Sequence, residues 1–385
     1  MIANNVFVKN NEVQLIKGAE YFSKLKEIIQ QAKHEIYFHT YIFSNDYTGT
    51  LVGDYLIAAA NKGVKIFLLI DGIVSHGLSK ETCDKFKAAK IDMVFYEPLF
   101  HSKHRYFGRR MHQKVIVVDQ HVAIIGGMNI ADRYNNRPHQ MAWLDFAVCI
   151  KGEVIKDIVS YCWGVWSHET QAQSTFQTIE HENYNSKSED CFARIRINDW
   201  VWHRNDVSNS YLYLLKSAEK EVVILCSYFI PGRAIRRQLM RTAKKGIKIK
   251  VVMAGKSDVP VAKYAERWLY DWLLRYNIEL FEYQTNILHG KLAIADDKLV
   301  TIGSYNINDI STYASIEMNI DIKNDVFARK VKEEIQQIIK TECIQITKEL
   351  HKYRKNIFRQ LARWFSYQFI RIVFLSCTFY FKRKA

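Results

Sequence analysis

Two kinds of apolar periodicity alternate along this chain of 385 residues, one typical of amphipathic helices and one typical of buried strands. Within 20–33, Phe22, Leu25 and Ile29 fall on one helical stripe, whereas 64–72 is an almost continuous apolar run. This order is typical of β-α-β units. The elements predicted in the first half are helices at 20–33, 50–61 and 83–89, and strands at 35–43, 64–72 and 91–96.

The same order of elements returns roughly 180 residues later, which indicates an internal duplication with a period too long for a solenoid repeat. Between the two halves, 171–190 is polar, without apolar periodicity, and rich in Asn, Ser and Glu, so we predict a linker there. The elements predicted in the second half are helices at 206–220, 234–245 and 262–276, and strands at 221–230, 247–258 and 278–283.

Each half ends in a closely matching motif, HQKVIVVDQHVAIIGGMN at 112–129 and HGKLAIADDKLVTIGSYN at 289–306. Both have His, Lys two residues on, Asp five further, Gly seven after the Asp and Asn three after the Gly. Two apolar runs around a polar turn predict a strand, a turn and a second strand. Residues two apart on a strand share a face, so each His should lie beside its Lys.

An imidazole beside an ammonium group suits a phosphate, because the ring can attack phosphorus or deliver a proton while the ammonium offsets charge on the oxygens. Asn129 and Asn306 are predicted to donate hydrogen bonds to those oxygens, although Asn after Gly is also common in turns. Asp119 and Asp296 lie an odd number of residues from each His, which favours a turn or scaffold role. The candidate catalytic set is His112, Lys114, Asp119, His289, Lys291 and Asp296.

The paired motifs resemble those of the phospholipase D superfamily, whose members build one active site from two motifs and react through a phosphohistidine. Across roughly 13–360 the chain is also similar to bacterial cardiolipin synthases, in the form without N-terminal membrane spans. Besides the motifs, the similarity rests on SYFIPGRAIRRQLMRTAKKGIKIKVVMAGKSD, WHRND and DGIVS.

This resemblance implies an α/β fold of two phospholipase D-like domains, each a mixed sheet flanked by helices, related by a pseudo-twofold duplication. An amphipathic helical tail should follow them. The expected boundaries are 1–170 for the first domain, 171–190 for the linker, 191–345 for the second domain and 346–385 for the tail.

The resemblance also implies roles for single residues. It assigns His112 as nucleophile and His289 as acid and base, an order that the symmetric local sequence leaves open. Ser304 would join the two asparagines as a phosphate ligand, whereas Gly127 at the matching position departs from the Ser or Thr of the family. An acid downstream of each motif orients its His, which points to Glu317 after His289 and Asp145 after His112, unless both are ordinary strand acids.

Charge and cysteine usage narrow the class of protein. The net charge is +15, and 348–385 holds ten Lys or Arg against one acid, so most of the excess lies in the tail. Arg109 and Arg110, with His104 and Arg105, form a second basic segment that could gather anionic headgroups or simply be solvated. Seven scattered cysteines without a C-x-x-C pair favour reduced thiols over disulfides or a zinc site.

The tail combines this charge with aromatic residues at helical spacing. Apolar residues recur at 357, 361, 364, 365, 369 and 372, while Arg359 and Arg363 lie off that stripe. The final apolar stretch is too short to span a bilayer, so we predict an interfacial helix on a membrane. The alternative is a helix packed on the domain or on a second subunit.

The function predicted is that of a cardiolipin synthase, which transfers a phosphatidyl group between two phosphatidylglycerols and releases glycerol. The alternatives are a phospholipase D-type hydrolase or, with less support, a nuclease. We expect no metal or organic cofactor, no nucleic acid, and anionic phospholipids as partners, at the cytoplasmic face of a bacterial inner membrane, with the tail on its surface. The oligomeric state, the headgroups and the acyl preference stay open.

Overall fold

A computed structural model describes residues 6–75, 78–98, 109–171, 178–179, 191–353 and 356–382. The predicted linker and the basic residues His104 and Arg105 therefore lie almost wholly outside the described residues. Contacts divide the chain into two compact units. The first unit is Met1–Arg196 together with Ile302–Ser304 and Ile316–Ile322, and the second unit is the remainder of the chain.

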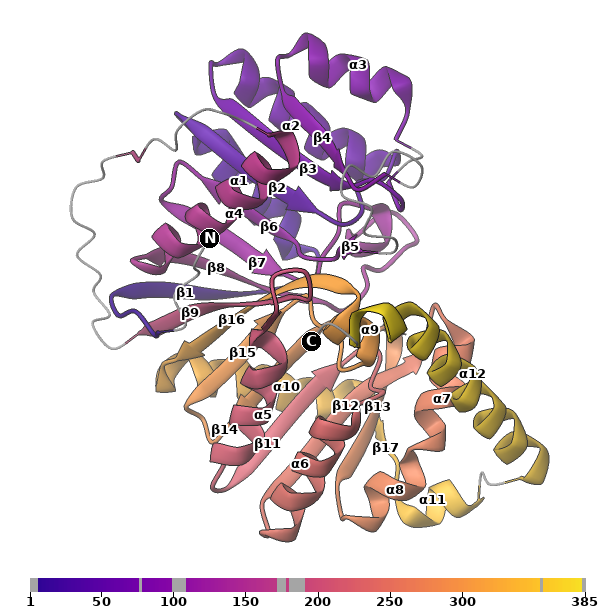
Figure 1. Cartoon of the computed structure of the whole chain (residues 1–385). Helices are drawn as coiled ribbons and strands as arrows, with labels where there is room; N and C mark the ends of the chain where they lie inside the picture. The colour runs from indigo at the N-terminus through magenta and orange to yellow at the C-terminus, as the bar shows by residue number, and fades with distance from the viewer. Residues whose placement is uncertain are drawn as a thin grey trace. The chain divides into compact units, whose positions relative to one another are not determined.

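The first unit contains a mixed sheet of seven strands in the order β1-β8-β7-β6-β2-β3-β4 (Figure 1). β2, β3 and β4 are parallel, whereas the pairs β2–β6, β6–β7, β7–β8 and β8–β1 are antiparallel. The strands are β1 (Asn11–Lys17), β2 (Glu35–Thr40), β3 (Lys65–Asp71), β4 (Asp92–Tyr96), β6 (Val115–Val118), β7 (Val122–Gly126) and β8 (Phe146–Gly152). The helices are α1 (Glu20–Gln31), α2 (Tyr47–Asn61), α3 (Lys80–Ala88), the 3-10 turn η1 (Asp132–Tyr134) and α4 (Val154–Thr170).

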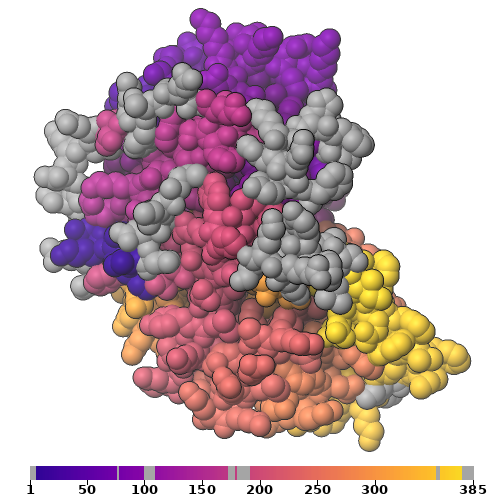
Figure 2. Space-filling view, viewed as in Figure 1, coloured from indigo at the N-terminus to yellow at the C-terminus, as the bar shows by residue number. Residues whose placement is uncertain are grey.

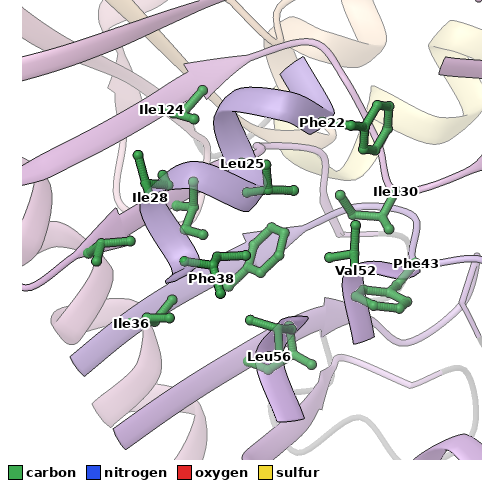
Figure 3. Close-up of a cluster of buried hydrophobic side chains, with 14 of the residues drawn as sticks. Phe22, Leu25, Ile28, Ile36, Phe38, Phe43, Val52, Leu56, Ile124 and Ile130 are labelled. Atoms are coloured by element: carbon green, nitrogen blue, oxygen red, sulfur yellow. The ribbon is translucent and has the colours of Figure 1, made fainter. Parts of the chain in front are cut away.

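Strand alternation sends neighbouring side chains of β2 into two different layers. Ile36 and Phe38 enter the apolar cluster beneath α1 and α2, where Leu25 also lies (Figure 3). Tyr37, between them in sequence, stacks on Phe67 and meets Trp163 of α4 edge to face. The sheet is thus covered on both faces, which is why apolar residues occur on both sides of its parallel strands.

A second mixed sheet has the order β10-β9-β16-β15-β14-β11-β12-β13-β17, and the short strand β5 pairs with β16. Its centre repeats the first sheet, because β11, β12 and β13 are parallel and β14 runs antiparallel to β11. The strands are β5 (Arg110–Met111), β9 (Phe192–Asp199), β10 (Arg204–Asn205), β11 (Glu221–Cys226), β12 (Lys248–Lys256), β13 (Glu279–Ile287), β14 (Lys291–Ala295), β15 (Leu299–Gly303), β16 (Ser315–Lys323) and β17 (Cys343–Gln345). The helices are α5 (Asp206–Ser217), α6 (Arg233–Lys244), α7 (Pro260–Trp268), α8 (Tyr270–Arg275), α9 (Asp309–Tyr313), α10 (Asp325–Glu342), α11 (Lys348–Tyr353) and α12 (Ile357–Lys382).

The predicted fold class is confirmed: a mixed sheet flanked by helices occurs twice, and a helix follows at the C-terminal end. Some element limits differ from the prediction. The strand at 35–43 ends at Thr40, because Tyr41 and Phe43 bond through their backbone to the Ser75 hydroxyl rather than to a neighbouring strand. The helix predicted at 262–276 is two helices, α7 and α8, which meet at Leu269.

The C-terminal helix α12 has two opposite apolar faces. Its inner face, with Tyr367, Ile370 and Phe374, is buried, and the helix packs on α7 and α9 of the second unit (Figure 1). Its outer face holds the stripe predicted from the sequence together with Phe358, and the helix lies at the surface of the second unit (Figure 2). We call this stripe the outer stripe; it consists of Ile357, Phe358, Leu361, Trp364, Phe365, Phe369 and Ile372, all exposed. Among the described residues, no helix is long and apolar enough to cross a bilayer.

A buried histidine next to the first motif makes folding sensitive to pH. His39 on β2 is fully buried, and burial lowers the pKa of its imidazole to about 3. Gln113 lies 3.1 Å from its Nδ1 and in turn accepts a hydrogen bond from Tyr161. The unfolded chain takes up a proton on this ring below about pH 6.5, whereas the folded chain does so only near pH 3.

We therefore expect the free energy of unfolding to fall as the pH drops from 6.5 toward 3. At pH 5 the contribution of His39 to this loss should be about 2 kcal/mol relative to pH 7. The variant His39→Asn keeps an acceptor near the Nδ1 position but cannot titrate, so its loss between pH 7 and pH 5 should be smaller by that amount. Urea denaturation at both pH values measures it, and equal losses in the two proteins would contradict the assignment.

Candidate active site

The two motifs form hairpins with the same turn. Asp119 and Gln120 join β6 to β7, Asp296 and Asp297 join β14 to β15, and all four residues have positive φ between 50° and 56°. Two successive residues of positive φ are the mark of the tight hairpin turn that matches the twist of the strands. The sequence motif therefore spans one hairpin in each half, as predicted.

The motif aspartates hold these hairpins to the neighbouring strand. The Asp119 carboxylate accepts hydrogen bonds from the backbone N–H groups of Lys33, His34 and Glu35, at the start of β2. Three donors on one carboxylate explain why this residue is Asp. The Asp119 carboxylate bonds to backbone N–H groups at the turn, so we interpret Asp119 as a scaffold residue. This corrects its inclusion in the candidate catalytic set.

Asp296 repeats this arrangement in the second unit. Its carboxylate accepts from the backbone N–H groups of Glu219, Lys220 and Glu221, ahead of β11. Partial burial would raise the pKa of Asp296, but the three amides outweigh burial and lower it. Asp296 is likewise a scaffold residue, in agreement with the argument from its odd spacing and against its inclusion among the catalysts.

The backbone on either side of His112 is fixed by side chains and by strand pairing. The buried Asp71 carboxylate, at the end of β3, accepts from the Met111 N–H at 3.0 Å and pairs with Arg110 at 2.9 Å. The His112 N–H donates to the Ile316 carbonyl on β16. Arg110 is therefore engaged inside the unit rather than gathering headgroups, and Arg109 is buried beside the Tyr96 ring.

The imidazole of His112 is held by a carboxylate from the second half of the sequence. Glu317 Oε2, on β16, lies 2.8 Å from His112 Nδ1, and the Glu317 side chain is fully buried. The sequence prediction paired Glu317 with His289 and Asp145 with His112, because each pair belongs to one half. That pairing is wrong for His112, since its Nδ1 is taken by Glu317.

Ser304 completes this arrangement as a partner of the carboxylate. Its hydroxyl donates to the same Oε2 of Glu317 at 2.6 Å and accepts from the Met318 N–H at 3.1 Å. A hydroxyl has one proton, and here that proton goes to the carboxylate. The prediction that Ser304 is a phosphate donor is therefore corrected: it supports Glu317, which in turn holds His112.

Gly127 shows why the first half lacks the equivalent serine. A Cβ at Gly127 would lie 2.4 Å from Asp145 Oδ1, so the carboxylate already occupies the space of a side chain. Asp145 is fully buried, and its Oδ1 also accepts from its neighbour's N–H, that of Phe146, at 2.7 Å. Gly127 and Asp145 of the first half thus correspond to Ser304 and Glu317 of the second half. Asp, the shorter acid, is found where the matching position is Gly and has no side chain.

Lys114 and Tyr41 surround the His112 ring within the first unit. The Lys114 ammonium donates to the His112 carbonyl and lies 4.8 Å from the centre of the Tyr41 ring. Tyr41 meets the imidazole edge to face, with 4.7 Å between the ring centres. Burial, with a smaller effect of Asp71, raises the pKa of Tyr41. The Tyr41 side chain is therefore uncharged at pH 7 beside the imidazole.

The second motif gives His289 a different neighbour. The buried Lys291 ammonium lies 2.9 Å from His289 Nδ1 and also donates to the His289 carbonyl. An ammonium has only donors, so Nδ1 accepts and the ring proton is on Nε2. His112 has the opposite pattern, because a carboxylate at Nδ1 leaves the lone pair on Nε2.

The two asparagines that end the motifs have their side-chain amides oriented by hydrogen bonds. Asn129 accepts from the Ile42 N–H and donates to the Tyr134 hydroxyl. Asn306 accepts from the Ser227 hydroxyl at 2.7 Å. Each amide oxygen is occupied, so only the NH₂ side of each group is suited to an incoming oxygen.

Sequence reasoning named Arg110 and Ser304 as possible ligands of anionic groups, but it missed the positioning contacts that these residues and Asp71 make. Asp71 carried a usable signal, since it is an acid at the end of a buried parallel strand, where sites often form. Nothing in the sequence marks Arg110 or Ser304 as partners of distant carboxylates, because those contacts arise from strand pairing.

If Asp296 is a scaffold, Asp296→Ala should lower the free energy of unfolding by about 1–3 kcal/mol, because three backbone donors lose their acceptor. Lys298→Ala, exposed in the same hairpin, is the matched control and should change stability by less than about 0.5 kcal/mol. Urea denaturation of both variants measures the difference. A normal stability of Asp296→Ala would show that the carboxylate does not hold the turn.

Comparison with known proteins agrees with this geometry. The family model described as "Cardiolipin synthase, PLD-like domain" matches twice, at 25–163 and at 211–339. Proteins named cardiolipin synthase B from Shigella flexneri and Escherichia coli (strain K12) are each 30% identical over 88% of this chain and 83% of their own length. In fold, the chain is similar to a phosphatidylserine synthase from Haemophilus influenzae, with a TM-score of 0.73, 14% identity and 95% of each chain covered.

The family model matches once in each half of the chain. Each match includes one motif hairpin with its His and Lys. The chain belongs to the cardiolipin synthases of the phospholipase D type, a family of phosphatidyltransferases.

Proposed function

We propose that this protein makes cardiolipin from two molecules of phosphatidylglycerol and releases glycerol, through a phosphohistidine at His112. The observation that carries the proposal is the hydrogen bond between Glu317 and His112 Nδ1, backed by Ser304. A carboxylate at Nδ1 holds the ring in the tautomer whose Nε2 lone pair is free, and it stabilises the positive charge that develops when Nε2 forms a bond. Of the two motif histidines, His112 is therefore assigned the attack.

In the first half-reaction, His112 Nε2 forms a bond to the phosphorus of phosphatidylglycerol and the bond from phosphorus to the glycerol oxygen breaks. The leaving oxygen needs a proton, which His289 supplies from Nε2 while its Nδ1 takes one from the Lys291 ammonium, so the ring leaves this step neutral. The contact between Lys291 and His289 Nδ1 supports this role, since it puts the ring proton on Nε2.

In the second half-reaction, a hydroxyl of another phosphatidylglycerol gives its proton to His289 and attacks the phosphohistidine. The bond from phosphorus to nitrogen breaks, and cardiolipin forms. Lys114, Lys291 and the NH₂ groups of Asn129 and Asn306 are proposed to stabilise charge on the phosphoryl oxygens.

Two other reactions of the superfamily use the same intermediate. In a phospholipase D-type hydrolase, water resolves the phosphohistidine and the product is phosphatidic acid. A nuclease would attack a nucleic acid phosphodiester. The two cardiolipin synthase B relatives, matched over most of their length, favour lipid transfer. So does the charge of the chain, most of which lies in an aromatic, apolar tail.

Purified protein with vesicles of pure phosphatidylglycerol should yield cardiolipin and glycerol in equal amounts, measured by mass spectrometry of the lipids and an assay of free glycerol. Glu317→Gln keeps the size of the side chain but removes its charge, so kcat should fall by about 10²- to 10⁴-fold. His112→Ala should abolish turnover, because no other group carries the phosphatidyl intermediate.

His34→Ala changes an exposed histidine of the same unit and is the matched control, with turnover close to that of the unchanged protein. Phosphatidic acid as sole product would replace the synthase by the hydrolase. Normal turnover of His112→Ala would refute the nucleophile itself.

We further propose that the outer stripe of α12 lies on the surface of an anionic membrane. Phe358 is 77% exposed and Phe369 56% exposed, although both are large apolar residues. Exposed Arg359 lies on the same helix outside the stripe, and exposed Lys352 of α11 shortly precedes it in sequence. A helix with an apolar outer face and basic neighbours binds a membrane interface, with about 1 kcal/mol from each basic residue near anionic lipid.

Replacing both phenylalanines, Phe358→Ala with Phe369→Ala, should weaken binding to phosphatidylglycerol vesicles by about tenfold or more for each ring that inserts. Alanine preserves the helix. Val326→Ala, which truncates an exposed apolar residue on α10, is the control and should float with vesicles as the unchanged protein does. If the double variant floated with vesicles as well as the unchanged protein does, the outer stripe would not be the membrane contact.

A further inference from the structure

A cavity of about 360 Å³ lies at the base of α12, wholly within the second unit. The elements that surround it are α7, α8, β13, α11 and α12. Its volume is within the range of small-molecule sites. The polar groups that line it include three guanidinium groups, a hydroxyl and an imidazole, from Arg267, Arg359, Arg363, Tyr270 and His351.

The acidic groups around this cavity are already used by other cations. Glu282 pairs with Arg267 through two bonds of 2.9 and 3.0 Å and accepts from the Tyr270 hydroxyl. Burial opposes the charge of Glu282, but Lys263 and Arg267 outweigh it and lower the pKa of that carboxyl to about 2. Lys263 also pairs with the buried Glu266. These two cations and two anions balance one another.

Asp271 lies beside His351, another residue that lines the cavity. Its carboxylate lies 3.2 Å from His351 Nε2 and is partly exposed. Two arginines one helical turn apart on α12, Arg359 and Arg363, therefore add positive charge that the neighbouring carboxylates do not match. The lining of the cavity has an excess of positive charge.

Arg363 is the residue that points to a ligand. It is only 6% exposed, and among the described residues its buried Nη1 has no hydrogen-bond acceptor. Burial, then the charges of Arg267 and Arg359, lower the pKa of Arg363, while Tyr270 and Asp271 act in the opposite direction. A guanidinium stays charged at any ordinary pH, so its donors need an acceptor.

We propose that this cavity is an anion site that binds a phosphate group, as a phosphomonoester or phosphodiester, between Arg363, Arg359 and Arg267. Planar guanidinium groups match the spacing of phosphate oxygens and bind them through paired hydrogen bonds. The volume accepts a group larger than phosphate alone, such as a glycerophosphate.

The position of the cavity indicates one source for that phosphate. Phe358 and Leu361 of the outer stripe stand on either side of Arg359 in the sequence of α12, and Arg363 follows Leu361 by two residues. A lipid whose tails met the stripe would bring its headgroup to the base of this helix. The other source of the same chemistry is a soluble phosphate ester.

The test uses the full-length protein and three probes: inorganic phosphate, glycerol 3-phosphate, and vesicles of phosphatidylglycerol in phosphatidylcholine. Thermal unfolding is followed at increasing phosphate or glycerol phosphate, with sodium chloride at equal ionic strength as reference. Vesicle binding is followed by flotation. All of these readouts are independent of turnover and are repeated with His112→Ala, so loss of catalysis and loss of this site are distinguishable.

Arg363→Met removes the charge and keeps the length of the side chain, whereas Arg371→Met changes an exposed arginine two turns further along α12. We expect the midpoint of unfolding of the unchanged protein and of Arg371→Met to rise with phosphate or glycerol phosphate. Arg363→Met should bind these anions at least tenfold more weakly. Without anion it should unfold at the same temperature as the unchanged protein or higher, because it no longer buries an unpaired charge.

A loss confined to vesicles assigns the site to a lipid headgroup, and a loss confined to the soluble probes assigns it to a free phosphate ester; either supports the site. If Arg363→Met does not fold, Arg363→Lys keeps the charge without the planar fork, and it should also bind at least several-fold more weakly. Equal responses of Arg363→Met and Arg371→Met to all three probes would overturn the proposal, as would equal responses of Arg363→Lys and Arg371→Met.

Discussion

One carboxylate oxygen organises the first histidine site. Glu317 Oε2 receives the hydrogen bonds of both His112 Nδ1 and the Ser304 hydroxyl, and the side chain that carries it is fully buried. A buried carboxylate is costly unless donors surround it, so Glu317 constrains its neighbours as much as they constrain it. The tautomer of His112, and with it the availability of Nε2, depends on this pair.

The remainder of the scaffold places the backbone next to His112 beside that carboxylate. Asp71 and Arg110 hold β5 in the first unit, and β5 pairs with β16, which carries Glu317. Asp119 and Asp296 close their hairpins onto the strand that leads each half. The acids of the two motifs therefore support the turns, while Glu317, downstream of the second motif, bonds to His112.

The C-terminal helix shows a different compromise. One face of α12 is buried against α7, the opposite face is apolar and exposed, and a buried arginine lies on the inner side. A helix selected only for packing would not expose Phe358 and Phe365, and it would not bury the Nη1 of Arg363 without an acceptor among the described residues. We propose a separate explanation for each departure: a surface that meets lipid for the exposed rings, and a cavity that binds phosphate for the arginine.

The sequence by itself determined the elements that repeat at short range. Apolar periodicity, the two His-x-Lys hairpins and the stripe on the tail are local patterns, because period 2 and period 3.6 are properties of the backbone. The odd step from each His to its Asp was also enough to favour a scaffold role for Asp119 and Asp296. The limits of the elements, such as the end of β2 at Thr40, were less accurate, because they depend on which partner takes the last hydrogen bonds.

Only the tertiary structure decided which residues meet across long separations. Glu317 is much closer in sequence to His289, yet its carboxylate bonds to His112, 205 residues away. Distance along the chain carries no information about such a contact, since strand pairing between β5 and β16 brings the two together. The same reason explains the engagement of Ser304 with Glu317, the space filled by Asp145 beside Gly127, and the burial of Arg363: each depends on what packs against the residue, which the order of amino acids alone does not reveal.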